Sequence, residues 1–306
     1  MTKAVAVLMG GRSVEREVSL VTGRAVARGL EDAGYRVMRL EVGRDIVESI
    51  TALAPRPDVV FNALHGRFGE DGTVQGLLDL LGIPYTHSGV LASALAMNKA
   101  MAKRLFAEVG LPIAEGLVAE RDRIDGPAPM DPPFVVKPVA EGSSIGVRIV
   151  AKGENRPSLR EADFQHGDSV LVERFVPGRE LTVAVMGDRA LGVTEIRPRK
   201  GFYDYRAKYT EGVADHVVPA QIHPHAYDEA MRIGLEAHRA LGCRGVSRAD
   251  LRYDDTEGEP GRLILLEVNT QPGMTPLSLV PEQAAHAGIA FPALVAWIVE
   301  EARCDT

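Results

Sequence analysis

Hydrophobic and polar positions in the first third of the chain alternate between strand-like and helix-like patterns. Residues 3–9 form a continuous apolar run, which is typical of a strand covered on both faces. Gly10 and Gly11 end this run, and Ser13 stands where the N-cap of a following helix is expected. The apolar positions of that helix recur at helical spacing before Gly34, and they are Val18, Val21, Ala25, Val26 and Leu30.

Two more strands are expected at residues 36–42 and 58–64, with helical material at 46–53 between them. Strand–helix–strand alternation predicts a parallel sheet with right-handed crossovers. The first 97 residues are therefore expected to form a small open α/β domain. A dinucleotide-dependent dehydrogenase is not expected, because no G-x-G-x-x-G follows the first strand.

The pattern changes after Asn98, which is expected to cap a helix over 99–109 that ends at Gly110. A charged stretch rich in Gly and Pro at 121–133 is typical of a loop. The strands beyond it have short connections, an antiparallel pattern, and they are expected at 134–139, 146–150, 170–175, 180–186 and 191–197. Two more strands, at 246–253 and 262–268, are expected after a helix. Two helices are expected to bury one face each, the first with Ala226, Ala230, Ile233, Ala237 and Leu241 and the second with Phe291, Leu294, Ile298 and Ala302. This α+β part is expected to divide near residue 180.

Composition and charge restrict the partners of the chain. Hydrophobic residues make up 45% of its 306 residues, which excludes a disordered chain. Its 42 acidic and 35 basic side chains leave a net charge of −7, which argues against nucleic acid or an anionic membrane as a partner. No apolar run approaches the ~18 residues that span a bilayer, and the first one is too short for a secretory signal. Two cysteines, Cys243 and Cys304, cannot form a disulfide framework, so a cytoplasmic protein is expected.

Polar side chains stand together in the last two expected strands. Arg248 and Asp250 share one strand face, and so do Glu267 and Asn269 at the end of an apolar run. If the two strands pair, these four groups converge on one patch. Carboxylate and amide oxygens there would suit Mg²⁺, which usually also takes nucleotide phosphates as ligands. A polar sheet face exposed to solvent is the alternative interpretation, and it stays open at this point.

Two weaker features also fit nucleotide binding. Lys137 ends an apolar strand before a loop of small residues, whose backbone N–H groups could cradle phosphate oxygens. This loop is not a Walker A loop, in which the lysine follows the glycines. Glu173 and Glu180 flank a short connection that would suit an adenine amine and ribose hydroxyls. Taken alone, the loop fits an ordinary hairpin turn and the two acids fit ordinary surface charge.

Four longer segments, in this order along the chain, carry a family resemblance. They are GGRSVEREVS at 10–19, HGRFGEDGTVQG at 65–76, FYDYRAKY at 202–209 and EVNTQPGMT at 267–275. With the features above, they resemble the ATP-grasp ligases and, closely and from end to end, the D-alanine–D-alanine ligases. The resemblance implies an ATP-grasp fold of α/β and α+β class, with an N-terminal Rossmann-like open α/β domain (1–97), a central nucleotide-clamp domain (98–180) and a C-terminal domain (181–306).

The family joins two D-alanines through a D-alanyl phosphate, with ATP converted to ADP, to make a peptidoglycan precursor. Such catalysis depends on positioning and charge neutralisation around the γ-phosphate. The resemblance implies ATP as a substrate, two Mg²⁺ ions that Mn²⁺ can replace, and a cytoplasmic homodimer with contacts in the N-terminal domain. The alternatives are a relative that joins D-alanine to D-serine or D-lactate, and a non-catalytic nucleotide-binding relative. Lys208 and Tyr209 disfavour D-lactate, and the presence of every metal and phosphate residue disfavours the non-catalytic relative.

The resemblance also assigns site residues by their positions in the motifs. The metal ligands would be Asp250, Glu267 and Asn269. The residues that would bind ATP are Lys99 and Lys137 at the phosphates, Glu173 and the backbone near Val176 at the adenine, Glu180 at the ribose, and Lys208 in the 202–209 loop. In this region Arg174 stands where the family commonly has lysine.

Glu15 would receive the ammonium of the first D-alanine, with His65 close to the same substrate. Arg248 and the backbone of Gly273 would stabilise the oxyanion, and Ser278 and Leu279 would bind the carboxylate of the second D-alanine. Ser143 and Tyr209 would join Glu15 in a network that closes the loop over the site and excludes water. Outside the motifs, Glu15 could equally be an acid favoured by the helix macrodipole, and His65 a structural histidine. The sequence departs from the family pattern at Ser247, Ala249, Gln271 and Pro276, and Pro276 is expected to stiffen the backbone before Ser278.

Overall fold

The N-terminal sheet of the computed structural model is parallel, as the strand–helix alternation predicts. The structure describes residues 2–51, 53–154, 158–199 and 213–305. Strand β1 (Ala4–Gly10), buried along its whole length, lies between β2 (Arg36–Val42) and β3 (Val59–Asn62). The helices of this part are α1 (Arg16–Asp32), α2 (Ile46–Thr51), α3 (Thr73–Leu80) and α4 (Val90–Met97).

Ser13 does not cap α1, so that expectation was wrong. Glu15 occupies the N-cap position, and no side chain caps the helix by a hydrogen bond. The Ser13 hydroxyl instead donates to the carbonyl of His65 at 2.7 Å and accepts from the backbone N–H of Glu15 at 3.1 Å. The Ser13 side chain thus binds a residue far away in the sequence, and this hydrogen bond connects the segments 10–19 and 65–76. Asn98, by contrast, does cap α5 (Lys99–Glu108), because its side chain accepts from the N–H of Met101.

A central antiparallel sheet follows α5, with the strand order β4-β7-β5-β6. Its strands are β4 (Gly116–Glu120), β5 (Phe134–Pro138), β6 (Arg148–Val150) and β7 (Ser169–Arg174), and two short 3-10 turns lie at Arg121–Arg123 and Glu161–Phe164. Strand β4 was not expected. It lies at the edge of the sheet with only Ala119 buried, so it lacks the apolar alternation that marks a strand.

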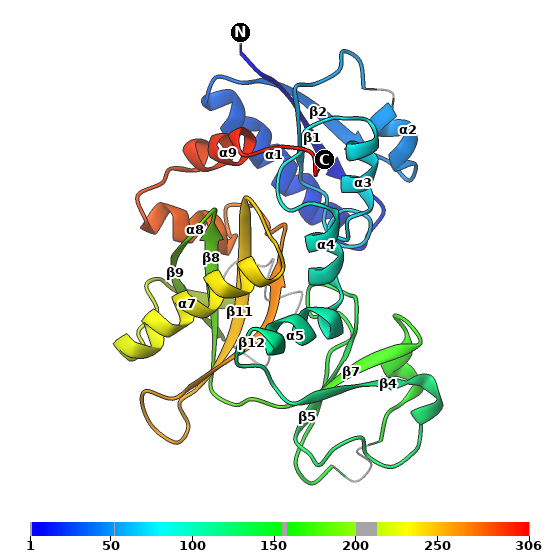
Figure 1. Ribbon diagram of the computed structural model, residues 1–306, viewed down its shortest axis with the longest axis vertical. Coiled ribbons are helices and arrows are strands. Elements are labelled where there is room, and N and C mark those ends of the chain that lie inside the picture. The colour runs from blue at the N-terminus through cyan, green and yellow to red at the C-terminus, as the bar shows by residue number, and fades with distance from the viewer. Residues whose placement is uncertain (1, 52, 155–157, 200–212, 306) are drawn as a thin grey trace.

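The C-terminal sheet is antiparallel, in the order β10-β9-β8-β11-β12. Its strands are β8 (Arg179–Met186), β9 (Arg189–Pro198), β10 (Ala214–Val217), β11 (Val246–Asp254) and β12 (Arg262–Asn269). Helix α7 (Pro224–Ala240) packs on this sheet with the apolar face that its spacing predicts. The central and C-terminal sheets lie side by side below the N-terminal sheet; α4 leads down from the N-terminal domain and α5 runs across, next to β12 (Figure 1).

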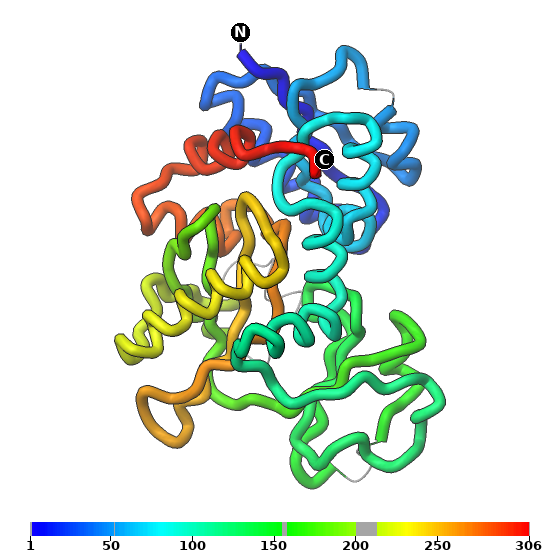
Figure 2. The backbone as a smooth tube through the Cα atoms, in the orientation of Figure 1, coloured from blue at the N-terminus to red at the C-terminus, as the bar shows by residue number. Residues whose placement is uncertain are grey.

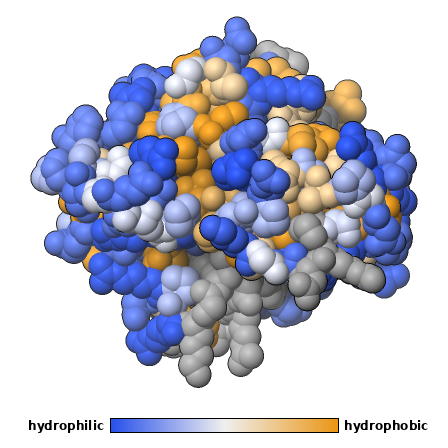
Figure 3. Space-filling model, turned by 90° about the horizontal axis from the view of Figure 1, so that it is seen from below, coloured by the Kyte–Doolittle hydropathy of each residue, from blue (hydrophilic) through white to orange (hydrophobic). Residues whose placement is uncertain are grey.

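The end of the chain returns to the N-terminal sheet. Helices α8 (Leu279–His286) and α9 (Phe291–Glu300) share one apolar cluster with β1, β3 and α1, and α9 lies beside α1 (Figure 1). Both ends of the chain therefore lie on the same domain (Figure 2). No single helix in the described ranges is long and apolar enough to cross a membrane; α8 and α9 pass that test only as a pair, bent by 106°. On the face seen from below, apolar side chains gather toward the middle between hydrophilic ones (Figure 3).

Candidate active site

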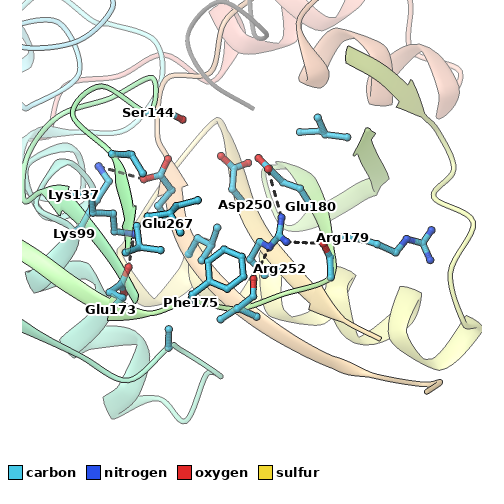
Figure 4. Close-up of a pocket in the computed structure, with 18 of the residues that line it drawn as sticks. Lys99, Lys137, Ser144, Glu173, Phe175, Arg179, Glu180, Asp250, Arg252 and Glu267 are labelled. Atoms are coloured by element: carbon cyan, nitrogen blue, oxygen red, sulfur yellow. Dashed lines mark hydrogen bonds and ion pairs between the residues drawn. The ribbon is translucent and has the colours of Figure 1, made fainter. Parts of the chain in front are cut away.

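A cavity of about 680 Å³ lies between the central and C-terminal sheets. Its walls come from α5, from β5 and β7 on one side, and from β8, β11 and β12 on the other. Lys99, Lys137 and Glu173 stand on one side of it, and Asp250, Glu180 and Arg252 on the other (Figure 4). Its size is that of a typical small-ligand site, large enough for a nucleotide.

Both lysines that the sequence predicts at the phosphates line this cavity. Lys99 is the first residue of α5, where the Asn98 cap fixes the start of the helix. Its ammonium donates to the carbonyl of Glu141 at 2.6 Å and lies 3.3 Å from the Glu267 carboxylate. Lys137, on β5, pairs with Glu173 on the neighbouring strand β7. The two cations thus stand on one wall, which suits a polyphosphate chain.

Glu173 is a buried carboxylate held between two ammonium groups. Its Oε2 atom pairs with Lys137, and its Oε1 atom lies 2.5 Å from the Nζ atom of Lys103. Burial alone would raise the pKa of Glu173, but Lys137 and Lys103 outweigh it and hold that pKa below its usual value. Burial lowers the pKa of Lys103 to about 8, against the opposing effect of Glu173. Lys103 did not figure in the sequence analysis, although it stands four residues after Lys99 and so shares its helix face.

An arginine that the sequence analysis did not identify holds the connection between β7 and β8 by hydrogen bonds. Arg252, on β11, donates to the carbonyls of Val176 at 3.2 Å and Gly178 at 2.6 Å. It also lies 3.9 Å from the Glu180 carboxylate. Val176 and Glu180, the residues expected at the adenine and the ribose, therefore lie on one fastened segment of the cavity wall.

The four polar groups of the last two strands converge, because β11 and β12 pair in the register that this requires. Asp250 lies opposite Glu267, and Arg248 opposite Asn269. The Arg248 guanidinium donates twice to Asp250, at 2.8 and 2.7 Å, and Thr182 donates to the same carboxylate at 2.8 Å. The convergence expected from pairing is confirmed: Asp250 and Glu267 line the cavity, and Arg248 and Asn269 lie opposite each other two positions along the same pair of strands.

The donor set of this patch fits a hard cation. Two carboxylates and the amide oxygen of Asn269 are the ligand types that Mg²⁺ prefers, and phosphate oxygens would complete its coordination. The Asn269 amide oxygen accepts from the N–H of Gln271 at 2.8 Å, which fixes the orientation of that side chain. Protein side chains alone do not close a metal cage: no group of three His, Cys, Asp or Glu residues among the described ranges could hold a metal ion. The residues therefore fit an ion that is bound together with a nucleotide.

Glu15 lies beside the small-residue loop, to which Lys99 also donates a hydrogen bond at the carbonyl of Glu141. It is 5% exposed, and the Ser143 hydroxyl donates to its carboxylate. The structure thus brings together two of the three residues expected in the closing network. The third, Tyr209, lies with Lys208 and the rest of 202–209 outside the described residues.

His65 is held on both ring nitrogens. Nδ1 lies 2.9 Å from the Glu70 carboxylate, and Nε2 lies 3.0 Å from the Thr22 hydroxyl. Burial alone would lower the pKa of His65, but Glu70 outweighs it and raises that pKa. Neither Thr22 nor Glu70 figured among the expected site residues. The approach of Thr22 depends on how α1 packs, whereas Glu70 stands only five residues after His65 in the same 65–76 segment.

Ser278 and Gly273 are close together, as two neighbouring substrate positions require. A Cβ atom added at Gly273 would lie 3.0 Å from the Ser278 hydroxyl. Ser278 is the N-cap residue of α8, and its hydroxyl accepts from the N–H of Thr275 at 2.9 Å. Leu279 is buried against Ile196 of β9.

Comparison with known proteins adds an independent line of evidence. A family model described as "D-ala D-ala ligase C-terminus" matches residues 105–300, and one described as "D-ala D-ala ligase N-terminus" matches residues 44–88. The chain is 62% identical over 308 residues to a D-alanine–D-alanine ligase of Paramagnetospirillum magneticum, covering 100% of both chains. It is 56% identical to one of Granulibacter bethesdensis, covering 99% of this chain and 98% of that one.

Solved structures give the same result. The D-alanine–D-alanine ligase of Bacillus anthracis, solved as a complex with ATP, superposes with a TM-score of 0.83 at 30% identity. The match covers 98% of this chain and 97% of that one.

Proposed function

We propose, from the premise that this chain belongs to the D-alanine–D-alanine ligase family, that it joins two D-alanine molecules at the expense of ATP. It is an ADP-forming ligase of the ATP-grasp fold, and its product is a precursor of peptidoglycan. One observation carries the proposal: the paired carboxylates Asp250 and Glu267 line a nucleotide-sized cavity together with Lys99 and Lys137, and Arg248 and Asn269 pair beside them.

The first step would activate a carboxylate. A D-alanine carboxylate oxygen attacks the γ-phosphorus of ATP, which yields D-alanyl phosphate and ADP. Lys99 and Lys137 neutralise phosphate charge, Glu173 and the backbone near Val176 hold the adenine, and Glu180 holds the ribose. Asp250, Glu267 and Asn269 would hold two Mg²⁺ ions, for which Mn²⁺ can substitute, and these ions would screen charge on the phosphates when bound.

The second step would form the peptide bond. The neutral amine of the second D-alanine, oriented by its carboxylate at Ser278 and Leu279, attacks the acyl carbon. Phosphate then leaves and takes up the proton that the nitrogen loses. The guanidinium of Arg248 and the backbone N–H of Gly273 would stabilise the negative oxygen of the tetrahedral intermediate. Asp250 holds the guanidinium by two hydrogen bonds, so Arg248 is oriented before the substrates arrive.

Glu15 would bind the ammonium of the first D-alanine. Its carboxylate is buried and already accepts from Ser143, so its position is fixed. His65 would contact the same substrate from the loop that Ser13 ties to the start of α1. Lys208 and Tyr209 would close over the reacting groups and keep water from the acyl phosphate.

Domain boundaries at 97/98 and 180/181 are part of the proposal. The three separate sheets support a division into three domains, although β8 of the C-terminal sheet begins at Arg179, just before the second boundary. We further propose a homodimer with contacts through the N-terminal domain. Its place of action would be the cytoplasm, which supplies ATP and suits the free thiols of Cys243 and Cys304.

The decisive experiment incubates the purified protein with ATP, Mg²⁺ and D-alanine and measures ADP and D-alanyl-D-alanine. Equal amounts of both products are expected. ADP that appears only when D-serine or D-lactate is added with D-alanine would replace the proposal by a ligase of different acceptor choice. ATP binding without turnover for any acceptor would replace it by a non-catalytic nucleotide-binding protein.

A further inference from the structure

We propose that Lys103 is a positioning residue that sets the selectivity of the site for adenine, by keeping Glu173 charged and in place when Lys137 turns to the phosphates. The inference rests on the proposed function, in which Glu173 accepts a hydrogen bond from the 6-amino group of adenine. Lys103 itself touches neither nucleotide nor metal ligand. It acts through Glu173.

The two lysines at Glu173 occupy different places. Lys137 and Glu173 both line the cavity, whereas Lys103 is not among the described residues that do. The Lys103 side chain is 7% exposed, and its ammonium reaches Glu173 Oε1 at 2.5 Å and the carbonyl of Leu265, on β12, at 3.4 Å. Lys103 therefore lies behind Glu173, and Lys137 lies on the side from which a nucleotide would enter.

Each oxygen of the Glu173 carboxylate has its own cation. Lys137 holds Oε2, and Lys103 holds Oε1. Lys137 must turn toward a phosphate when ATP binds, and this weakens its hold on Glu173. A carboxylate that is 3% exposed and has lost its only cation would carry a large desolvation penalty and would take up a proton or move. Lys103 prevents this, because it stays beside the other oxygen.

The geometry also leaves Glu173 able to accept from adenine. Lys103 holds the buried Oε1 atom from behind, so Oε2, which Lys137 leaves when it turns to a phosphate, is the oxygen offered to the cavity. A carboxylate oxygen has two lone-pair directions, and an amino group approaching from the cavity can use one of them. A charged carboxylate is also the stronger acceptor.

The competing interpretation is that Lys103 only ties α5 to β7 and β12. Loss of such a tie would weaken the binding of every nucleotide alike. Loss of a positioning residue for Glu173 would instead weaken the binding of nucleotides that carry a 6-amino group and spare those that lack it.

The test compares Lys103→Met with Arg104→Met, a matched control that removes the same charge from the next, exposed position of α5. Initial rates of phosphate release are measured with ATP and with purine riboside triphosphate, which lacks the 6-amino group. For Lys103→Met we expect kcat/KM to fall about 10-fold or more with ATP, mainly through KM, and less than about 3-fold with the analogue. Arg104→Met should leave both values unchanged. Equal losses with the two nucleotides, or no loss with either, would overturn the proposal.

A second pair of variants keeps the test decisive if Lys103→Met does not fold. Glu173→Gln removes the buried charge. Adding Lys103→Met to this variant should therefore leave the ratio of kcat/KM for ATP to kcat/KM for the analogue unchanged within about twofold. A further change in that ratio would show that Lys103 does not act through Glu173. If the wild-type protein forms no dipeptide, the same comparison is made by calorimetric binding of the two nucleotides, so failure of the proposed reaction remains separate from failure of this inference.

Discussion

Gln271→Met is expected to weaken the contact between the segment that follows β12 and the segment that contains Asn62 and Leu64. The Gln271 side chain is 2% exposed, and its amide oxygen accepts from the Asn62 side chain at 2.8 Å. Its amide nitrogen donates to the carbonyl of Leu64. Methionine has a similar volume and neither polar group, so the substitution isolates the loss of these two hydrogen bonds.

The magnitude follows from what the substitution leaves behind. The carbonyl of Leu64 loses the Gln271 donor, and a buried polar group without a partner costs about 1–3 kcal/mol. Asn62 loses one acceptor but still donates to the carbonyl of Gly69 at 2.9 Å, so its loss lies at the lower end of that range. We therefore expect the free energy of unfolding to fall by about 3 kcal/mol. His65 follows Leu64, so the KM for the first D-alanine should rise more than the KM for ATP.

Urea unfolding followed by the fluorescence of Trp297, the single tryptophan of the chain, measures the first effect, and initial rates measure the second. Gln165→Met, a substitution at an exposed position, is the control and should change neither quantity. A loss of stability below about 0.5 kcal/mol, the usual range for surface substitutions, would refute the reasoning.

Four further results are expected. Glu267→Gln should lower turnover at least about 100-fold, because it removes a proposed metal ligand, and it should leave the circular dichroism spectrum unchanged. Near-normal ADP release would contradict the metal assignment. Glu15→Gln should raise the KM for the first D-alanine about 10-fold or more in initial-rate assays, since a hydrogen bond to a charged group is lost, whereas an unchanged KM would remove Glu15 from that role. Chelation by EDTA should abolish turnover, and added Mg²⁺ or Mn²⁺ should restore it; EDTA-resistant ADP release would exclude the metal. Burial lowers the pKa of His238 to about 4 from 6.5. Between these two pH values the histidine is protonated in the unfolded chain but not in the folded one, so the free energy of unfolding decreases as the pH is lowered. The slope of urea-derived stability against pH should therefore be up to about 1.4 kcal/mol per pH unit smaller in His238→Gln than in wild type, and identical slopes would rule out this histidine as the cause.

Sequence patterns predicted the parts of the site that depend on local order along the chain. Alternation along a strand places Asp250 and Glu267 on known faces, and antiparallel pairing then brings them together. The cap at Asn98 and the position of Lys99 are local in the same way. These features need only neighbouring residues, which is why they could be read from the chain.

The remaining features depend on contacts between distant segments. Asn62 and Gln271 are 209 positions apart, and neither residue type signals a partner. The burial of Lys103 is equally hidden, because a lysine on a short helix is usually exposed. Ser13 was misassigned as a cap for the same reason: the carbonyl of His65 binds its hydroxyl.

The return of α8 and α9 to the N-terminal sheet has a consequence for synthesis on the ribosome. The apolar cluster of the first domain joins residues such as Val5 and Leu30 with Leu294 and Ile298, and the Lys3–Glu300 ion pair closes it at 2.5 Å. At about 5–20 residues per second, the last helix emerges roughly 15–50 seconds after α1. For that interval the first domain lacks one wall of its core. A nascent chain stalled before residue 290 should therefore leave exposed the apolar side chains of β1 and α1 that Leu294 and Ile298 cover in the finished fold, although those residues were translated first.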